Sequence, residues 1–199
     1  MPLSMLRFVA ILVIALIASM PAWSTPPTTV PPASAGATVD DSARGDELRR
    51  TVVAPALRAW FEAHRDEWAP TEAEIDRMVA WTHEANRCPG REPTPALDAE
   101  VSRQIATAFV AGPKRQRFLQ RRFGGKRVLW QQFGVEAFDA TYRLVLSLEK
   151  EGQIVFATPA DRALALDYWT RDQGAWTSDY KSDDESFRMV YDAPPCPPE

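Results

Sequence analysis

A helical pattern runs through VEAFDATYRLVLSLEKE, residues 135–151, and this stretch decides the fold class. Its large apolar side chains recur every three or four residues, which is the spacing of one helix face. These side chains are Val135, Phe138, Tyr142, Val145 and Leu148. The apolar face is wide, and a wide face is typical of a helix that is largely buried. We therefore expect a central helix here, ended by Gly152.

A capping box marks a second helix. In Thr71-Glu-Ala-Glu74 the threonine hydroxyl accepts from amides of the first helical turn, while the Glu74 side chain reaches back to the cap. This helix is expected to end near Cys88-Pro-Gly. Upstream, apolar side chains at helical spacing predict another helix over residues 46–68. Pro55 is expected to kink or restart that helix, because proline lacks an amide proton.

Two Thr-Pro pairs mark further helix starts, with threonine as the cap and proline in the first helical position. The helix that follows Thr94 is expected to stop at residues 112–113, a Gly-Pro pair, and a separate short basic helix over residues 114–123 comes next. The helix that follows Thr158 is expected to run through Trp169.

Three short segments lack a helical pattern. Residues 127–133 are ambiguous between strand and helix, residues 154–156 resemble a short extended link, and residues 187–191 are a candidate short strand. The predicted fold is mainly α, an irregular bundle of five to six helices with short strand segments and one disulfide.

The N-terminus has the pattern of a secretory signal peptide. Arg7 is the only charged residue before Asp40, and it precedes an apolar run over residues 8–20. That run is shorter than the roughly 20 residues that a membrane-spanning helix needs. Small residues follow, so we expect residues 1–24 to be a signal peptide cleaved before Thr25.

The segment after the signal peptide is rich in Pro, Thr and Ala. Residues 25–45 contain almost no large apolar side chain, so burial cannot offset the entropy of ordering them, and we expect a disordered linker. Residues 46–199 should form a single helical domain with a Pro-rich C-terminal tail. No integral membrane span is expected after signal cleavage, and the expected localisation is periplasmic or secreted.

The chain has two cysteines, Cys88 and Cys196. In an oxidising compartment an even pair most simply forms one disulfide, which would fasten the proline-flanked tail to the loop at Cys88. An intermolecular bond or free thiols remain the alternatives. Two cysteines without a nearby histidine supply too few ligands for a metal site, so neither metal nor cofactor is expected.

The basic stretch, defined as residues 114–127, is the candidate binding segment. No acid occurs between residues 111 and 135, and seven basic residues lie within the stretch: Lys114, Arg115, Arg117, Arg121, Arg122, Lys126 and Arg127. Arginine binds carboxylates and phosphates in a planar fork. An anionic partner outside the cytoplasm is one interpretation. The alternative is internal pairing, because residues 158–199 hold nine acids against four basic residues.

A second candidate segment, Trp130-Gln-Gln-Phe-Gly134, borders the basic stretch. Its amides Gln131 and Gln132 can hydrogen-bond a ligand, or they can merely satisfy loop backbone. Six tryptophans follow the signal peptide, and core packing is favoured over a glycan-binding cleft because several lie on predicted helices. The predicted binding residues are Arg117, Arg121, Arg122, Lys126, Arg127, Trp130, Gln131 and Gln132.

Only two histidines are present, so a metal or general-base site would have to use them. His64 and Glu67 share a helix face and His83 can join from the next helix, but a hydrogen-bonded core imidazole is favoured for His64. Ser147-Leu-Glu-Lys150 matches a Ser-x-x-Lys pattern at the wrong end of its helix, so we reject it as a catalytic motif.

The favoured function is an exported, non-catalytic helical binding or accessory protein. Its partner would be an acidic protein or an anionic component of the cell envelope, and nucleic acid is not expected outside the cytoplasm. The alternative is a small cell-envelope hydrolase that uses carboxylates or the pair His64 and His83.

Overall fold

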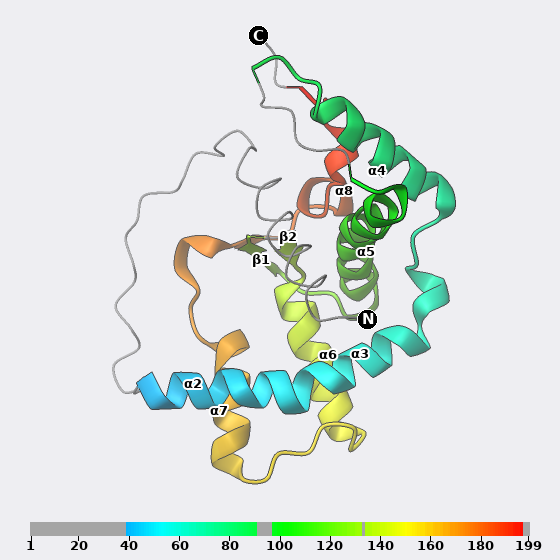
Figure 1. The fold of residues 1–199 in the computed structure, drawn as a ribbon. Coiled ribbons are helices and arrows are strands. Elements are labelled where there is room, and N and C mark those ends of the chain that lie inside the picture. The colour runs from blue at the N-terminus through cyan, green and yellow to red at the C-terminus, as the bar shows by residue number, and fades with distance from the viewer. Residues whose placement is uncertain (1–38, 91–96, 133, 197–199) are drawn as a thin grey trace.

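The computed structural model describes residues 39–90, 97–132 and 134–196. Within them the chain is mainly helical, with a small three-stranded sheet and one disulfide (Figure 1). The predicted fold class is thereby confirmed. The expected signal peptide, residues 25–38 of the expected linker and the Thr94-Pro95 helix start lie outside the described residues.

The first long helix bends around a proline without breaking. It consists of α2 (Val39–Leu48), a π-helical turn (Arg49–Val53) and α3 (Ala54–Ala63), and a 3-10 turn (Arg65–Glu67) follows. Pro55 cannot donate a hydrogen bond and its ring crowds the preceding turn. The wider π turn directly before it accommodates that ring, so the helix continues instead of restarting.

Helix α2 packs against α7 (Pro159–Thr170), as Figure 1 shows at the blue end of the chain. A Cβ atom at Gly45 would lie 2.8 Å from the Leu164 carbonyl oxygen, so only glycine permits this close approach. Arg44 pairs with Asp161 at 3.0 Å across the same contact. The predicted linker is therefore wrong for residues 39–45, because they form the first turns of α2, which the close approach at Gly45 and the Arg44–Asp161 pair hold against α7.

Helix α4 (Glu72–Ala85) begins with the predicted capping box: Glu74 N donates to Thr71 Oγ1, and Thr71 N donates to the Glu74 carboxylate at 2.7 Å. Helix α5 (Ala99–Phe123) is capped by Asp98 and runs straight through Pro113. The predicted stop at residues 112–113 is wrong, and the expected separate basic helix is the second half of α5.

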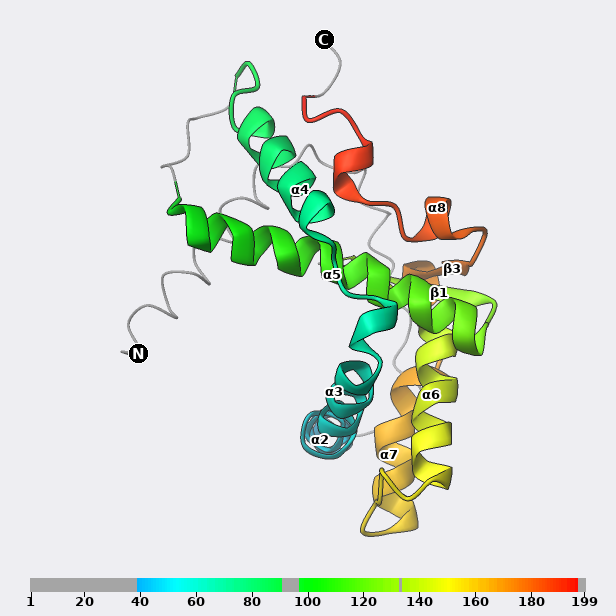
Figure 2. The same ribbon diagram turned by 90° about the vertical axis from the view of Figure 1, so that its right-hand side faces the viewer.

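Helix α5 continues through Pro113 for two reasons, one local and one that involves other helices. Proline disfavours the helical conformation in the preceding residue through contact with that residue's Cβ, and Gly112 has none. The two halves of α5 are also held separately: α4 packs along the first half and α6 (Phe138–Lys150) along the second (Figure 2).

The sheet has the order β2-β1-β3, with both pairs antiparallel. Strand β1 (Arg127–Gln131) pairs with β2 (Gly134–Glu136) and with β3 (Thr177–Asp179). The ambiguous segment 127–133 therefore contains a strand. The central helix starts at Phe138 rather than residue 135, because residues 134–136 pair with β1 instead.

The main core surrounds α6, and side chains of this helix are fully buried: Phe138, Leu144, Val145 and Leu148. A second, smaller core joins α4 and α5 to the C-terminal segment through Ile75, Met78, Ala106, Val110 and Met189. The predicted central helix is thus confirmed as buried.

The C-terminal segment contains β3, α8 (Asp183–Ser186) and two 3-10 turns, Gly174–Trp176 and Val190–Asp192. The predicted strand at residues 187–191 is wrong. The Phe187 carbonyl accepts hydrogen bonds from the Arg117 side chain, and the Phe187 ring is buried against Tyr180, so side chains rather than a neighbouring strand hold this backbone.

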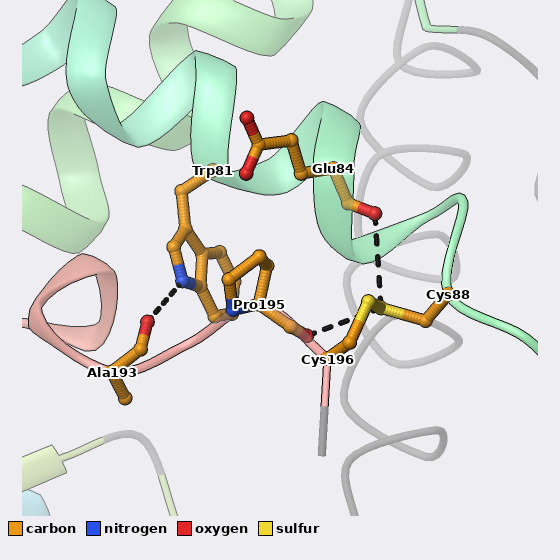
Figure 3. Close-up of a disulfide and its surroundings, with 6 residues drawn as sticks. All are labelled: Trp81, Glu84, Cys88, Ala193, Pro195 and Cys196. Carbon is orange, nitrogen blue, oxygen red and sulfur yellow. Dashed lines mark hydrogen bonds between the residues drawn. A yellow bond between two sulfur atoms is a disulfide. The ribbon is translucent and has the colours of Figure 1, made fainter. Parts of the chain in front are cut away.

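The predicted disulfide between Cys88 and Cys196 is present, with 5.4 Å between the two Cα atoms (Figure 3). Nearby, Trp81 Nε1 donates to the Ala193 carbonyl at 2.8 Å. The disulfide therefore fastens the C-terminal segment to the end of α4. Among the described helices, none combines the length and the apolar character needed to cross a membrane.

Candidate functional site

The basic stretch is largely neutralised by the chain's own carboxylates. Lys114 pairs with Glu74 at 2.7 Å, and Arg122 pairs with Glu67 at 3.3 Å. Arg121 bonds to Asp183 of the C-terminal segment at 2.6 Å. The alternative of internal pairing is therefore present in the structure. Only Asp183 belongs to the acidic C-terminal region in these three pairs, since Glu67 and Glu74 precede α5 in the chain.

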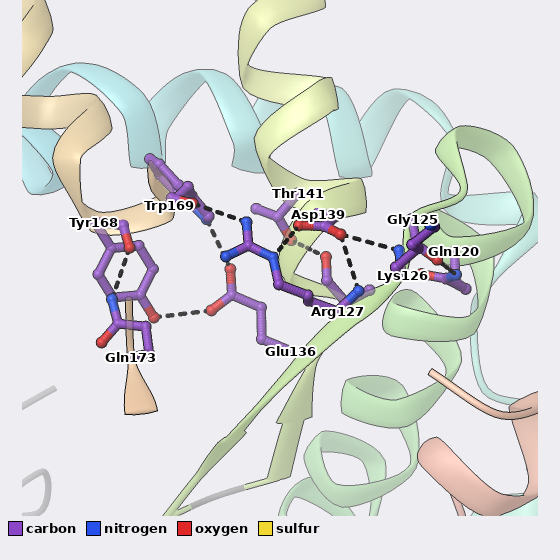
Figure 4. Close-up of polar contacts among 11 residues, drawn as sticks. Gln120, Gly125, Lys126, Arg127, Glu136, Asp139, Thr141, Tyr168, Trp169 and Gln173 are labelled. Carbon is purple, nitrogen blue, oxygen red and sulfur yellow. Dashed lines mark hydrogen bonds and ion pairs between the residues drawn. The ribbon is translucent and has the colours of Figure 1, made fainter. Parts of the chain in front are cut away.

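Two more of the predicted binding residues are structural contacts. Arg117 donates from Nε and Nη2 to the Phe187 carbonyl at 3.1 and 2.9 Å. Arg127 pairs with Asp139 at 2.8 Å and donates to the Trp169 carbonyl at 3.1 Å (Figure 4). These two guanidinium groups hold the C-terminal segment and α7 in place. In the basic stretch, Lys126 has an exposed side chain.

Asp139 ties the start of β1 to the first turn of α6. One of its oxygens accepts from the amides of Lys126 and Arg127, both at 2.9 Å, and the other accepts from Arg127 Nε (Figure 4). Burial acts to raise the pKa of Asp139, but these hydrogen bonds outweigh it and lower the pKa. Gly125 permits the approach, since a Cβ there would lie 2.5 Å from the Asp139 Cβ.

Glu136 is a buried carboxylate that accepts three hydrogen bonds from two elements, α7 and β1. Trp169 Nε1 donates at 3.1 Å, Tyr168 Oη at 3.0 Å and Gln131 Nε2 at 2.7 Å (Figure 4 shows the first two). Burial raises the pKa of Glu136 despite these donors. Burial and the neighbouring carboxylate also raise the pKa of Tyr168. The network connects β1, β2 and α7.

Gln131 joins this buried network to the surface. Its amide nitrogen donates to Glu136 and also lies 3.0 Å from Tyr168 Oη, while the residue itself is exposed. The amide is therefore oriented by buried partners, which reduces the entropy lost when an exposed side chain binds something. Gln132 is exposed at the turn that follows β1.

Two tryptophans are exposed at the same end of the sheet: Trp130 retains 40% of its accessible surface and Trp176 retains 56%. The last register pair is Leu129 with Thr177, so Trp130 directly follows it on one strand and Trp176 directly precedes it on the other. Trp130 Nε1 donates to Ser178 Oγ at 2.8 Å, which fixes the indole orientation.

We call Trp130, Gln131, Gln132 and Trp176 the sheet-end surface. The other described tryptophans follow the expected packing role: Trp68 and Trp169 are buried, and Trp60 and Trp81 are half-buried. Core packing is therefore confirmed for the tryptophans on the predicted helices. Trp130 and Trp176, the two exposed tryptophans, do not lie on those helices.

The histidines lie in different surroundings. His64 is half-buried, with Nδ1 2.8 Å from the Trp60 carbonyl oxygen and its ring 4.3 Å from the Trp60 ring centroid. His83 is exposed on α4. Over residues 39–90, 97–132 and 134–196, no three His, Cys, Asp or Glu side chains form a group that could hold a metal ion.

Family models, curated proteins and solved structures yield no match to this chain. Sequence patterns did not single out Glu136, Tyr168 or Trp176, because each becomes notable only when β1 pairs with its two neighbours. The only sequence pattern that pointed to the sheet-end surface was the pair of glutamines next to an aromatic residue in Trp130-Gln-Gln.

Proposed function

We propose that this protein is an exported, non-catalytic binding protein that recognises a protein partner through the sheet-end surface. Export is supported by the signal-peptide pattern of residues 1–24 and by the disulfide, a bond that persists in oxidising compartments. The basic stretch would serve mainly as an internal scaffold, because most of its guanidinium groups already bind the protein's own carboxylates and carbonyls.

One observation carries this proposal: Trp130 and Trp176 are both exposed at the same end of the sheet, while the tryptophans of α3, α4 and α7 are packed. Tryptophan is enriched among the residues that dominate binding energy at protein interfaces. Both indoles belong to paired or turn backbone rather than to a long loop, and Trp130 is further fixed by Ser178. Two exposed indoles near two amide side chains offer contact area together with hydrogen-bonding groups.

The test is affinity capture from envelope extract with three matched baits. The wild type is compared with the double variant Trp130→Ala/Trp176→Ala and with Val155→Ala, which trims an apolar side chain that is 73% exposed between α6 and α7. Any partner that the wild type captures is then purified and its affinity measured. The double variant should bind at least about 30-fold more weakly, as expected for interface hot spots, and Val155→Ala should bind like the wild type.

A fourth bait, Arg121→Glu/Arg122→Glu, separates this proposal from recognition of an anionic partner. If the basic stretch is the recognition surface, this variant loses the partner while the tryptophan variant keeps it. That result would refute the sheet-end proposal. Circular dichroism of each bait verifies that it is folded.

A further inference from the structure

The guanidinium group of Arg115 on α5 lies over two aromatic rings. Its Cζ lies 5.6 Å from the centroid of the Phe61 ring and 5.5 Å from that of the Trp68 ring. Its Nε is buried without a hydrogen-bond acceptor. Among the described residues the two terminal nitrogens have no hydrogen-bond partner either, and they are not fully buried. Within the part of the chain that the structure describes, Arg115 has no ion pair.

This environment leaves a positive charge only partly compensated. Burial lowers the pKa of Arg115, but arginine stays protonated in proteins, so the charge is retained at the cost of lost hydration. The two aromatic faces offset part of that cost through cation–π attraction. Lys114 and Arg122 on the same helix each pair with a carboxylate, whereas no carboxylate of residues 39–90, 97–132 and 134–196 pairs with Arg115.

The charged groups around Arg115 do not cancel its charge. Arg65 lies over the same Trp68 ring, at 5.9 Å from the centroid, and pairs with Glu62 at 3.2 Å. Glu67 is paired with Arg122. Each of these carboxylates therefore has its own cation, and the cluster keeps one net positive charge at Arg115.

We propose that Arg115, seated on the rings of Phe61 and Trp68, binds an oxyanion, either a carboxylate or a phosphate group. Its accessible nitrogens can donate to both oxygens of such a group, and the surrounding rings lower the local dielectric and strengthen the interaction. Nothing in the sequence distinguishes Arg115 from its basic neighbours. The site uses α3, the turn after it and α5, so it is independent of the sheet-end surface.

The test is thermal unfolding of the purified chain with inorganic phosphate or with acetate, at an ionic strength held constant with chloride. Ligand at ten times its Kd should raise the Tm of the wild type by about 3–6 °C, because only the folded protein binds it. Arg115→Met, which keeps an apolar stem between the rings, should lose this shift. Arg87→Gln removes the same charge from an exposed position at the end of α4 and should keep it.

General salting-out by phosphate raises the Tm of all three proteins equally, so the difference between them reports the site. A shift with phosphate alone would assign the site to phosphate groups, and a shift with both anions would include carboxylates. No shift in the wild type, or the same shift in Arg115→Met, would overturn the proposal. Should Arg115→Met fail to fold, the wild-type Arg115 Nε–H resonance decides: it must move with added anion.

Discussion

The anchor at Asp139 yields the sharpest prediction, because one side chain joins β1 to α6 through three hydrogen bonds of 2.8–2.9 Å. Asp139→Asn keeps the shape but replaces one acceptor oxygen with an NH₂ group that faces a donor. Hydrogen bonds to a charged group contribute about 1.5–3 kcal/mol each. Asp139 is partly accessible, so solvent screening reduces the loss, and we expect a destabilisation of about 2 kcal/mol.

The assay is urea unfolding at pH 7, followed by circular dichroism. The control is Asp184→Asn, which makes the same charge change on a side chain that is 96% exposed. We expect that control to change the free energy of unfolding by less than about 0.5 kcal/mol. Asp139→Ala, which removes every acceptor, should cost more than Asp139→Asn, because two backbone amides lose their partner.

The pH dependence gives an independent check. The folded protein holds the pKa of Asp139 below its ordinary value of 3.8. The stabilisation is therefore complete above pH 3.8 and is lost as the pH falls through the folded-state pKa. The gap in stability between the wild type and Asp139→Asn should be constant near neutral pH and shrink below pH 3.8. If Asp139→Asn and Asp184→Asn unfold at the same urea concentration, the anchor has no net effect and the reasoning is refuted.

Three further predictions test other parts of the fold. Burial raises the pKa of Glu136 above its ordinary 4.5, so the contribution of Glu136 to stability is fully present below pH 4.5 and declines as the pH rises. The urea midpoint of Glu136→Gln should not show that decline. Gly125→Ala should destabilise by about 3 kcal/mol in urea titrations, since its Cβ would collide with the first turn of α6, whereas Gly134→Ala, at a similar φ but in open space, should cost clearly less. Reduction of the Cys88–Cys196 disulfide, which spans 108 residues, should lower the free energy of unfolding by about 4–5 kcal/mol; an unchanged Tm in reductant would contradict the chain-entropy argument.

Local chemistry was sufficient for several elements. The capping box at Thr71 and the threonine cap at Thr158 depend on side chains within three residues of each other, and both are present in the structure. The apolar spacing of residues 138–148 was likewise enough to identify a buried helix. The pairing of Cys88 with Cys196 needed only the count of cysteines and an oxidising compartment.

Other elements depend on contacts between distant segments. Pro113 reads as a helix stop, yet α5 continues because α4 and α6 hold its two halves. Residues 134–136 read as the start of a helix, yet they pair with β1 because the turn after Gln131 brings them beside it. In both cases tertiary packing outweighs a local preference of a few kcal/mol or less.

The candidate surfaces divide in the same way. The groups available for binding follow from the residues alone: a run of basic residues, a Trp-Gln-Gln segment and an excess of acids near the C-terminus. Which of these groups remain free depends on the fold, because a charge is neutralised by whichever carboxylate the fold brings within reach. Glu67, Asp139 and Asp183 come from three different elements and bind Arg122, Arg127 and Arg121. Strand pairing, in turn, places the exposed Trp176 at the same end of the sheet as Trp130.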